Sequence, residues 1–214
     1  MTVRIIYCHP SDDSLTRELL DSFIEGLAEA GHEADVCDLY RSGFNPLLSE
    51  AEYRREAWYD GSLSVPPDVA LQQEAINRSD GLAFVFPLFW TDVPALLKGW
   101  FDRVWTWGFA YGSSPLPGTK QSAAQPNAGR RGMKTLKRAL YLCSAGNPLS
   151  VLEETGKTEA LGKIWLDDRI NDRAETSGII VFGGTSRELE SRESLRDAHL
   201  EQARKAGREF FQAQ

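Results

Sequence analysis

Apolar, strand-like runs alternate with helical patterns along most of the chain. The runs lie at residues 3–8, 33–37, 81–86, 139–143 and 178–182. All but the second are mostly apolar, which is typical of strands that are covered on both faces. Because consecutive parallel strands need a crossover between them, the alternation predicts a parallel sheet with helices on both sides.

Helical periodicity fills the intervals between these runs. The first apolar stripe ends at Gly31, a residue type that suits the end of a helix. Its members are Leu15, Leu19, Leu20, Phe23, Ile24 and Leu27. Further helices are predicted over residues 69–79, over 93–105, from about 150, and over 188–211. The pattern predicts a single α/β domain over residues 1–214, built as a three-layer sandwich around five parallel strands.

Two long segments, residues 40–67 and 113–138, fit no regular element. Segments of this length inside a compact domain are usually functional or mobile. The second carries basic residues and no acidic one: Lys120, Arg130, Arg131, Lys134, Lys137 and Arg138. It could be a solvated loop, a docking surface, or a device in which Arg130 and Arg131 select the 2′-phosphate of NADPH.

The overall charge and the cysteines exclude several classes of function. The 214 residues carry a net charge of −7, with a sequence pI near 5.1, so nucleic acid and anionic membrane surfaces are not predicted partners. Three cysteines without C-x-x-C spacing, Cys8, Cys37 and Cys143, argue against disulfides and a zinc site. No apolar run is long enough to cross a bilayer. A cytoplasmic location without membrane insertion or metal is therefore expected.

The loop after the first run, residues 9–16, leads directly into a helix. The free N–H groups of a first helical turn and the helix dipole attract anions, and Ser14 and Thr16 add hydroxyl donors. The alternative is that Ser11, Asp12 or Asp13 simply caps the helix. For His9, a ligand-positioning role is favoured over proton transfer.

The third and fourth runs are followed by loops of different chemistry. After the third come Pro87, Leu88, Phe89, Trp90 and Thr91, whose rings could wall a flat ligand or close the core. After the fourth come Ser144, Ala145, Gly146 and Asn147, whose amides could donate to a heterocycle or form an ordinary turn. Because carboxyl ends of parallel strands meet at one sheet edge, the three loops together predict a phosphate-bearing flat cofactor such as a flavin.

At this point the chain resembles the NAD(P)H:quinone oxidoreductases of the DT-diaphorase type, within the flavodoxin-like superfamily. The likeness is strongest over residues 3–112. It is carried by His9-Pro10 with Ser14-Leu15-Thr16, by Asp38-Leu39-Tyr40, by Phe86-Pro87-Leu88-Phe89-Trp90, by the run from Pro94 to Val104, and by Gly108-Phe109-Ala110-Tyr111. The resemblance implies the flavodoxin-like strand order 2-1-3-4-5 and a homodimer with its active site at the subunit interface.

The resemblance also implies a set of contacts and a reaction. Flavin-phosphate contacts fall on Ser14, Leu15 and Thr16 with His9 beside the flavin, isoalloxazine contacts on Pro87, Leu88, Phe89, Trp90 and Thr91, and flavin-edge contacts on Ser144, Ala145 and Gly146. Tyr111 would line the substrate pocket. Apart from the resemblance, we expect backbone N–H groups near Gly146 and Asn147 to stabilise charge on the reduced flavin, as an oxyanion hole does. The implied activity passes a hydride from NAD(P)H through N5 of FAD, or of FMN, to a quinone or similar acceptor.

The sequence departs from the family pattern in one region, and two alternative functions stay open. The region after the fourth run, residues 153–159, lacks the Tyr and His that better-known members carry there. The chain could instead be a soluble flavin-binding regulatory subunit of a potassium-efflux system, or a flavodoxin-type electron carrier.

Overall fold

A five-stranded parallel sheet forms the centre of the protein. The computed structural model describes residues 1–112, 132–189 and 192–212. The strands are β1 (Thr2–Tyr7), β2 (Glu33–Asp38), β3 (Gly81–Pro87), β4 (Leu136–Ser144) and β5 (Ala174–Phe182). They pair in the order β2-β1-β3-β4-β5, which confirms the predicted fold. β4 and β5 begin earlier than predicted, because their first residues include Lys137, Arg138, Glu175 and Thr176, which hide the apolar signal.

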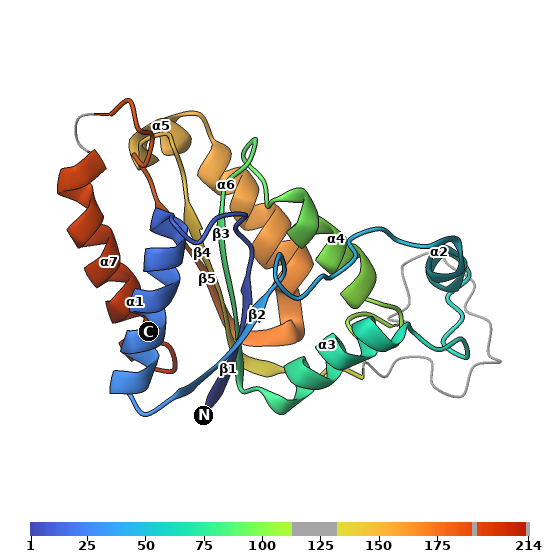
Figure 1. Cartoon of the computed structure of the whole chain (residues 1–214). Helices are drawn as coiled ribbons and strands as arrows, with labels where there is room; N and C mark the ends of the chain where they lie inside the picture. The colour runs from blue at the N-terminus through green and yellow to red at the C-terminus, as the bar shows by residue number, and fades with distance from the viewer. Residues whose placement is uncertain (113–131, 190–191, 213–214) are drawn as a thin grey trace.

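Helices cover both faces of the sheet (Figure 1). On one face lie α1 (Leu15–Glu29) and α7 (Arg192–Arg208), side by side. On the other lie α3 (Pro67–Arg78), α4 (Ala95–Val104) and η1 (Gly162–Ile170), a π-helix. Each face has its own core cluster, because side chains of successive strand residues point in opposite directions.

The contact between α1 and α7 depends on two glycines. A Cβ atom on Gly26 would stand 1.9 Å from the carbonyl oxygen of Arg204, and one on Gly207 would stand 2.2 Å from that of Phe23. The two helix backbones therefore approach more closely than any larger residue allows. Ion pairs line the outside of this contact, among them Arg196 with Glu18.

Several short helices were not predicted. Within the segment 40–67, α2 (Glu50–Ala57) begins at a capping box: the Ser49 hydroxyl accepts from the Glu52 N–H, and the Glu52 carboxylate accepts from the Ser49 N–H. The S-x-x-E spelling at 49–52 was the signal that could have identified it. α2 lies well away from the sheet (Figure 1). After β4, the expected short helix is α5 (Leu149–Glu154), followed by α6 (Lys157–Leu161), η1 and η2 (Asn171–Arg173).

A buried cation joins the segment 40–67 to α4. The Arg103 guanidinium donates to the carboxylates of Glu52, at 2.7 Å, and Asp68, at 2.5 Å, and to the carbonyl oxygen of Asn45, at 2.7 Å. Hydrogen bonding from Arg103 lowers the pKa of Asp68. Burial opposes ionisation of Glu52, yet bonds from Ser49 and Arg103 lower its pKa overall.

Cys8, Cys37 and Cys143 are free and buried. Burial raises the pKa of the Cys8 thiol to about 12. Among the described residues, none of the helices is both long and apolar enough to cross a bilayer.

Candidate active site

A cavity of about 570 Å³ opens at the carboxyl edge of the sheet, between the first turns of α1 and α7. Residues of the three predicted site loops and of the loop after β5 line it. Its lining residues are His9, Ser11, Asp13, Ser14, Leu15, Thr16, Glu18, Pro87, Ser144, Thr185, Arg187, Glu193 and Arg196. The structure thus brings the three predicted loops to one place, and the volume lies in the range of ligand and cofactor sites.

The first turn of α1 forms one wall of the cavity. Ser14 is its N-cap: the Ser14 hydroxyl accepts from the Arg17 N–H at 3.1 Å. The capping alternative therefore had the wrong residue, since Ser11, Asp12 and Asp13 all precede the cap. The N–H groups of Leu15 and Thr16 open the helix, where no preceding turn can supply a carbonyl. These two N–H groups are available to donate to an anion, and we call this side of the cavity the anion wall.

A buried hydrogen bond fixes two of the loops to each other. The hydroxyl oxygens of Thr16 and Ser144 lie 2.9 Å apart, and both side chains are buried. Because this bond joins the start of α1 to the end of β4, it fixes the spacing between the anion wall and the β4 loop. Thr16 therefore offers the cavity its backbone N–H more readily than its hydroxyl.

The polar residues before α1 are held locally. His9 Nδ1 lies 3.0 Å from the backbone nitrogen of Ser11 and 2.8 Å from its carbonyl oxygen, so either tautomer is anchored. The Asp12 carboxylate pairs with Arg41 at 2.5 Å and lies outside the cavity lining. Asp13 lines the cavity.

The β4 loop is bonded to the loop after β5. The carbonyl oxygens of Ala145, Gly146 and Asn147 accept from the N–H groups of Thr185, Ser186 and Gly184, in that order. Gly146 and Asn147 are exposed at the edge, beside the cavity lining rather than within it. Their predicted role in charge stabilisation stays a prediction.

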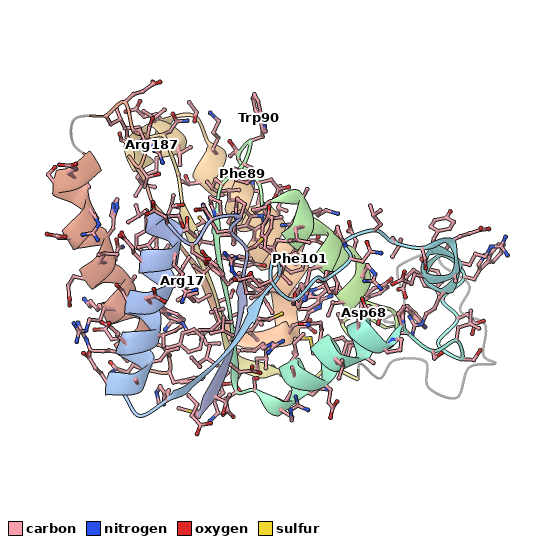
Figure 2. The ribbon with its side chains drawn as sticks, viewed as in Figure 1. Arg17, Asp68, Phe89, Trp90, Phe101 and Arg187 are labelled. Carbon is pink, nitrogen blue, oxygen red and sulfur yellow. The ribbon has the colours of Figure 1, made fainter. Side chains whose placement is uncertain are left out.

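Only part of the predicted aromatic wall reaches the cavity. Pro87 lines it, and the Leu88 N–H donates to the Ser144 carbonyl at 2.8 Å. Beyond Leu88 the chain turns back in a two-residue hairpin that is closed by reciprocal bonds between Phe89 and Asp92, at 3.0 and 3.1 Å. The Trp90 ring is fully exposed, at 102 % relative accessibility, and points out of the molecule (Figure 2).

Tyr111 does not share the cavity of its own chain. The Tyr111 hydroxyl donates to the Glu56 carboxylate of α2 at 2.6 Å, and its ring packs against Trp107. Burial and the Glu56 bond raise the pKa of the Tyr111 hydroxyl. Because α2 stands far from the sheet edge that carries the cavity (Figure 1), Tyr111 does not border this cavity, and its substrate-pocket role stays a prediction.

Sequence reasoning missed the contribution of the loop after β5 and of α7. Thr185, Arg187, Glu193 and Arg196 line the cavity on this side. Arg196 is occupied by Glu18, at 2.8 and 2.9 Å, whereas Arg187 forms no ion pair within the described residues. The place of this loop in the sequence could have identified it. The loop follows a fifth parallel strand and therefore opens on the same edge of the sheet as the other site loops.

Comparisons with known proteins agree with this geometry. The model of a family described as having a flavodoxin-like fold matches residues 1–207. The structure of an NAD(P)H:quinone oxidoreductase from Methanothermobacter marburgensis is 39% identical, with a TM-score of 0.87 over 100% of this chain and 98% of that one. The chain belongs to the NAD(P)H:quinone oxidoreductase family of the flavodoxin-like fold.

Relatives known from sequence are similar over a shorter length. NAD(P)H dehydrogenase [quinone] 1 of Rattus norvegicus is 35% identical over 122 residues, which cover 50% of this chain and 44% of the rat protein. The uncharacterized NAD(P)H oxidoreductase YcaK of Escherichia coli is 34% identical over 110 residues, 51% of this chain and 55% of that protein. The chain's matches thus span about half the length of these curated relatives.

Proposed function

We propose that this protein is a flavin-dependent NAD(P)H oxidoreductase that reduces a quinone or a similar small electrophile by two electrons. The cavity carries the proposal: it joins an open helix start, two fixed polar loops and Pro87 at one sheet edge. Membership of the quinone oxidoreductase family supports the same chemistry. The predicted cytoplasmic location stays a prediction.

The residues present fit a phosphorylated flat cofactor. The Leu15 and Thr16 N–H groups would hold a phosphate, since nothing within the helix can accept from them. Pro87 and Ser144 would border the ring, and the anchored His9 would position it. A bound flavin supplies the hydride chemistry, while the chain binds, orients and excludes water.

We propose FAD in preference to FMN. The cavity is also lined by Arg187 in the loop after β5 and by Glu193 and Arg196 in α7. A dinucleotide could use that side of the cavity, and the guanidinium of Arg187, which forms no ion pair with a described residue, suits a second phosphate. FMN would leave it vacant.

We also propose a homodimer whose partner completes each active site. Tyr111 is bonded to α2 and cannot serve its own cavity. Large apolar side chains are exposed on and beside α2, namely Tyr53, Trp58, Tyr59 and Leu63, as expected of a surface that a second subunit covers. Light scattering would report the mass. Mixing a cavity-blocked Thr16→Tyr chain with a Tyr111→Ala chain should restore activity that neither has alone.

The helix-start donors can be tested without disturbing the helix. Leu15 is the first residue of α1, where proline is tolerated and its missing N–H removes one donor. Leu15→Pro should weaken flavin binding by about tenfold or more relative to the matched control Leu15→Ala, because hydrogen bonds to charged groups are the stronger ones. Equal affinities for the two variants would argue against a phosphate at this turn.

A turnover assay distinguishes the proposed enzyme from the two alternative functions, an electron carrier and a regulatory subunit. Purified protein with added FAD or FMN should oxidise NADPH directly and reduce a benzoquinone. An electron carrier would bind flavin without oxidising NADPH, and a regulatory subunit would co-purify with a potassium-efflux membrane protein. The basic stretch that could dock such a partner lies largely outside the described residues, Arg130 and Arg131 included.

A further inference from the structure

The hairpin over residues 89–92 adopts a conformation that its own sequence disfavours. Trp90 and Thr91 have φ angles of +53° and +60°. Two consecutive residues with positive φ define the type I′ hairpin turn, which normally carries Asn-Gly or a similar pair. Threonine is β-branched, and such residues are rarely found at positive φ. The turn therefore needs a restraint from elsewhere in the molecule.

The Asp92 carboxylate provides that restraint. Its Oδ1 atom accepts from the Val93 N–H at 2.7 Å, from Trp165 Nε1 at 3.3 Å and from Arg169 Nη1 at 3.4 Å. Two of these donors belong to η1, which is far away in sequence. Asp92 thus connects the last residue of the strained hairpin to a helix on the α4 face.

The two donors of η1 are themselves firmly placed. The Trp165 ring is fully buried, stacks on Tyr141 at 5.1 Å and meets Phe86 edge-on at 5.3 Å. The Arg169 guanidinium lies 5.1 Å over the Phe101 ring. π-helical turns often occur at functional sites, and here the wide turn carries both donors toward Asp92.

We propose that Asp92 is a positioning residue for the flavin site. Held by Trp165 and Arg169, its carboxylate keeps the hairpin closed and so fixes the rim beside Pro87, where a planar acceptor would enter. The inference rests on the proposed function for its catalytic consequence, while the restraint itself is a property of the free chain.

The first test needs no cofactor. Asp92→Ala removes the acceptor, so chymotrypsin should cut after Phe89 or Trp90 in the apo-protein about tenfold faster, the ratio that corresponds to ~1.4 kcal/mol. Asp92→Asn keeps an acceptor oxygen in place, so this variant should be cut at close to the wild-type rate. Asp102→Ala, which removes a half-exposed carboxylate of α4 bound to Lys98, is the matched control. Mass spectrometry assigns the cut.

A rescue variant distinguishes a strained turn from general loosening. Glycine adopts positive φ at little cost, so Thr91→Gly added to Asp92→Ala should restore resistance at this site. A double variant that is cut as fast as Asp92→Ala would overturn the proposal, as would equal cutting of Asp92→Ala and wild type.

The second test is made on the flavin-loaded enzyme. Asp92→Ala should raise the KM for a benzoquinone by about tenfold and change kcat little, while Asp92→Asn and Asp102→Ala keep the wild-type KM. An equal fall of kcat in Asp92→Ala and Asp102→Ala would contradict positioning. If wild type fails to bind flavin or turn over, the proposed function falls, and the cleavage experiment still decides on the restraint.

Discussion

The two faces of the sheet are stabilised in different ways. On the α1–α7 face, helix backbones touch at Gly26 and Gly207, and the charges stay outside in exposed ion pairs. On the α3–α4–η1 face, large rings fill the core, and the charged Arg103 is buried among its partners. The first face relies on the close contact of two helix backbones, and the second adds a buried charge network to aromatic packing.

The candidate active site lies where these two faces meet. The α1–α7 face supplies the first turn of α1, which the hydrogen bond between Thr16 and Ser144 fixes to the end of β4. The α3–α4–η1 face supplies the hairpin at residues 89–92, which is held through Asp92 by η1. If the proposed flavin binds, a fixed first turn and a separately restrained rim would let the site hold the cofactor while the acceptor exchanges.

The largest effect should come from the buried network. Arg103→Met should lower the free energy of unfolding by about 4 kcal/mol, because it leaves the Glu52 carboxylate buried without its cation. Urea titration would measure the loss. A loss below about 1 kcal/mol, typical of an exposed pair, would show that the two faces do not differ in this way.

The next effect tests the shape of the α1–α7 contact. Gly26→Ala should cost about 3 kcal/mol, since overpacking against backbone atoms cannot be relieved by a side chain. Gly162→Ala is the matched control: a Cβ there meets nothing within 4 Å, and its φ is helical. If the two alanines behave alike in urea, the close approach of the helices is not a constraint.

A pH effect should appear on the α3–α4–η1 face. The pKa values of Glu52 and Asp68 are lower in the folded protein than in the unfolded chain, so their contribution is complete above about pH 5 and is lost as the pH falls through the folded values. The stability difference between wild type and Arg103→Met should shrink on acidification below about pH 4. A difference that stays constant down to pH 3 would contradict the assigned ionisation.

The smallest effect should come from the exposed ion pairs. Arg204 pairs with Glu29 on the surface of the α1–α7 contact. Arg204→Gln should leave the urea midpoint within experimental error, because exposed pairs are screened and entropically costly. A clear loss that vanishes at high salt would move part of the stability of this face from shape to charge.

The sequence was sufficient to predict the parallel sheet and the meeting of the site loops at one of its edges. Apolar runs at Phe84 and Tyr141 marked the central strands, and parallel topology then forced the loops at Thr16 and Ser144 to one edge. The hairpin escaped prediction because Trp90-Thr91 has no turn signature, and its restraint comes from Trp165, 73 residues away from Asp92. The position of Tyr111 beside α2 depends on tertiary contacts that no local pattern records.

Binding of a flavin in the cavity between α1 and α7 can be checked on the purified protein itself. Protein purified without added cofactor should be yellow, and denaturation should release a compound with a flavin absorbance spectrum and the mass of FAD. Release of FMN would retain the flavin site and contradict the use of the side of the cavity at Arg187. A colourless protein that takes up neither FAD nor FMN would show that this cavity is not a flavin site.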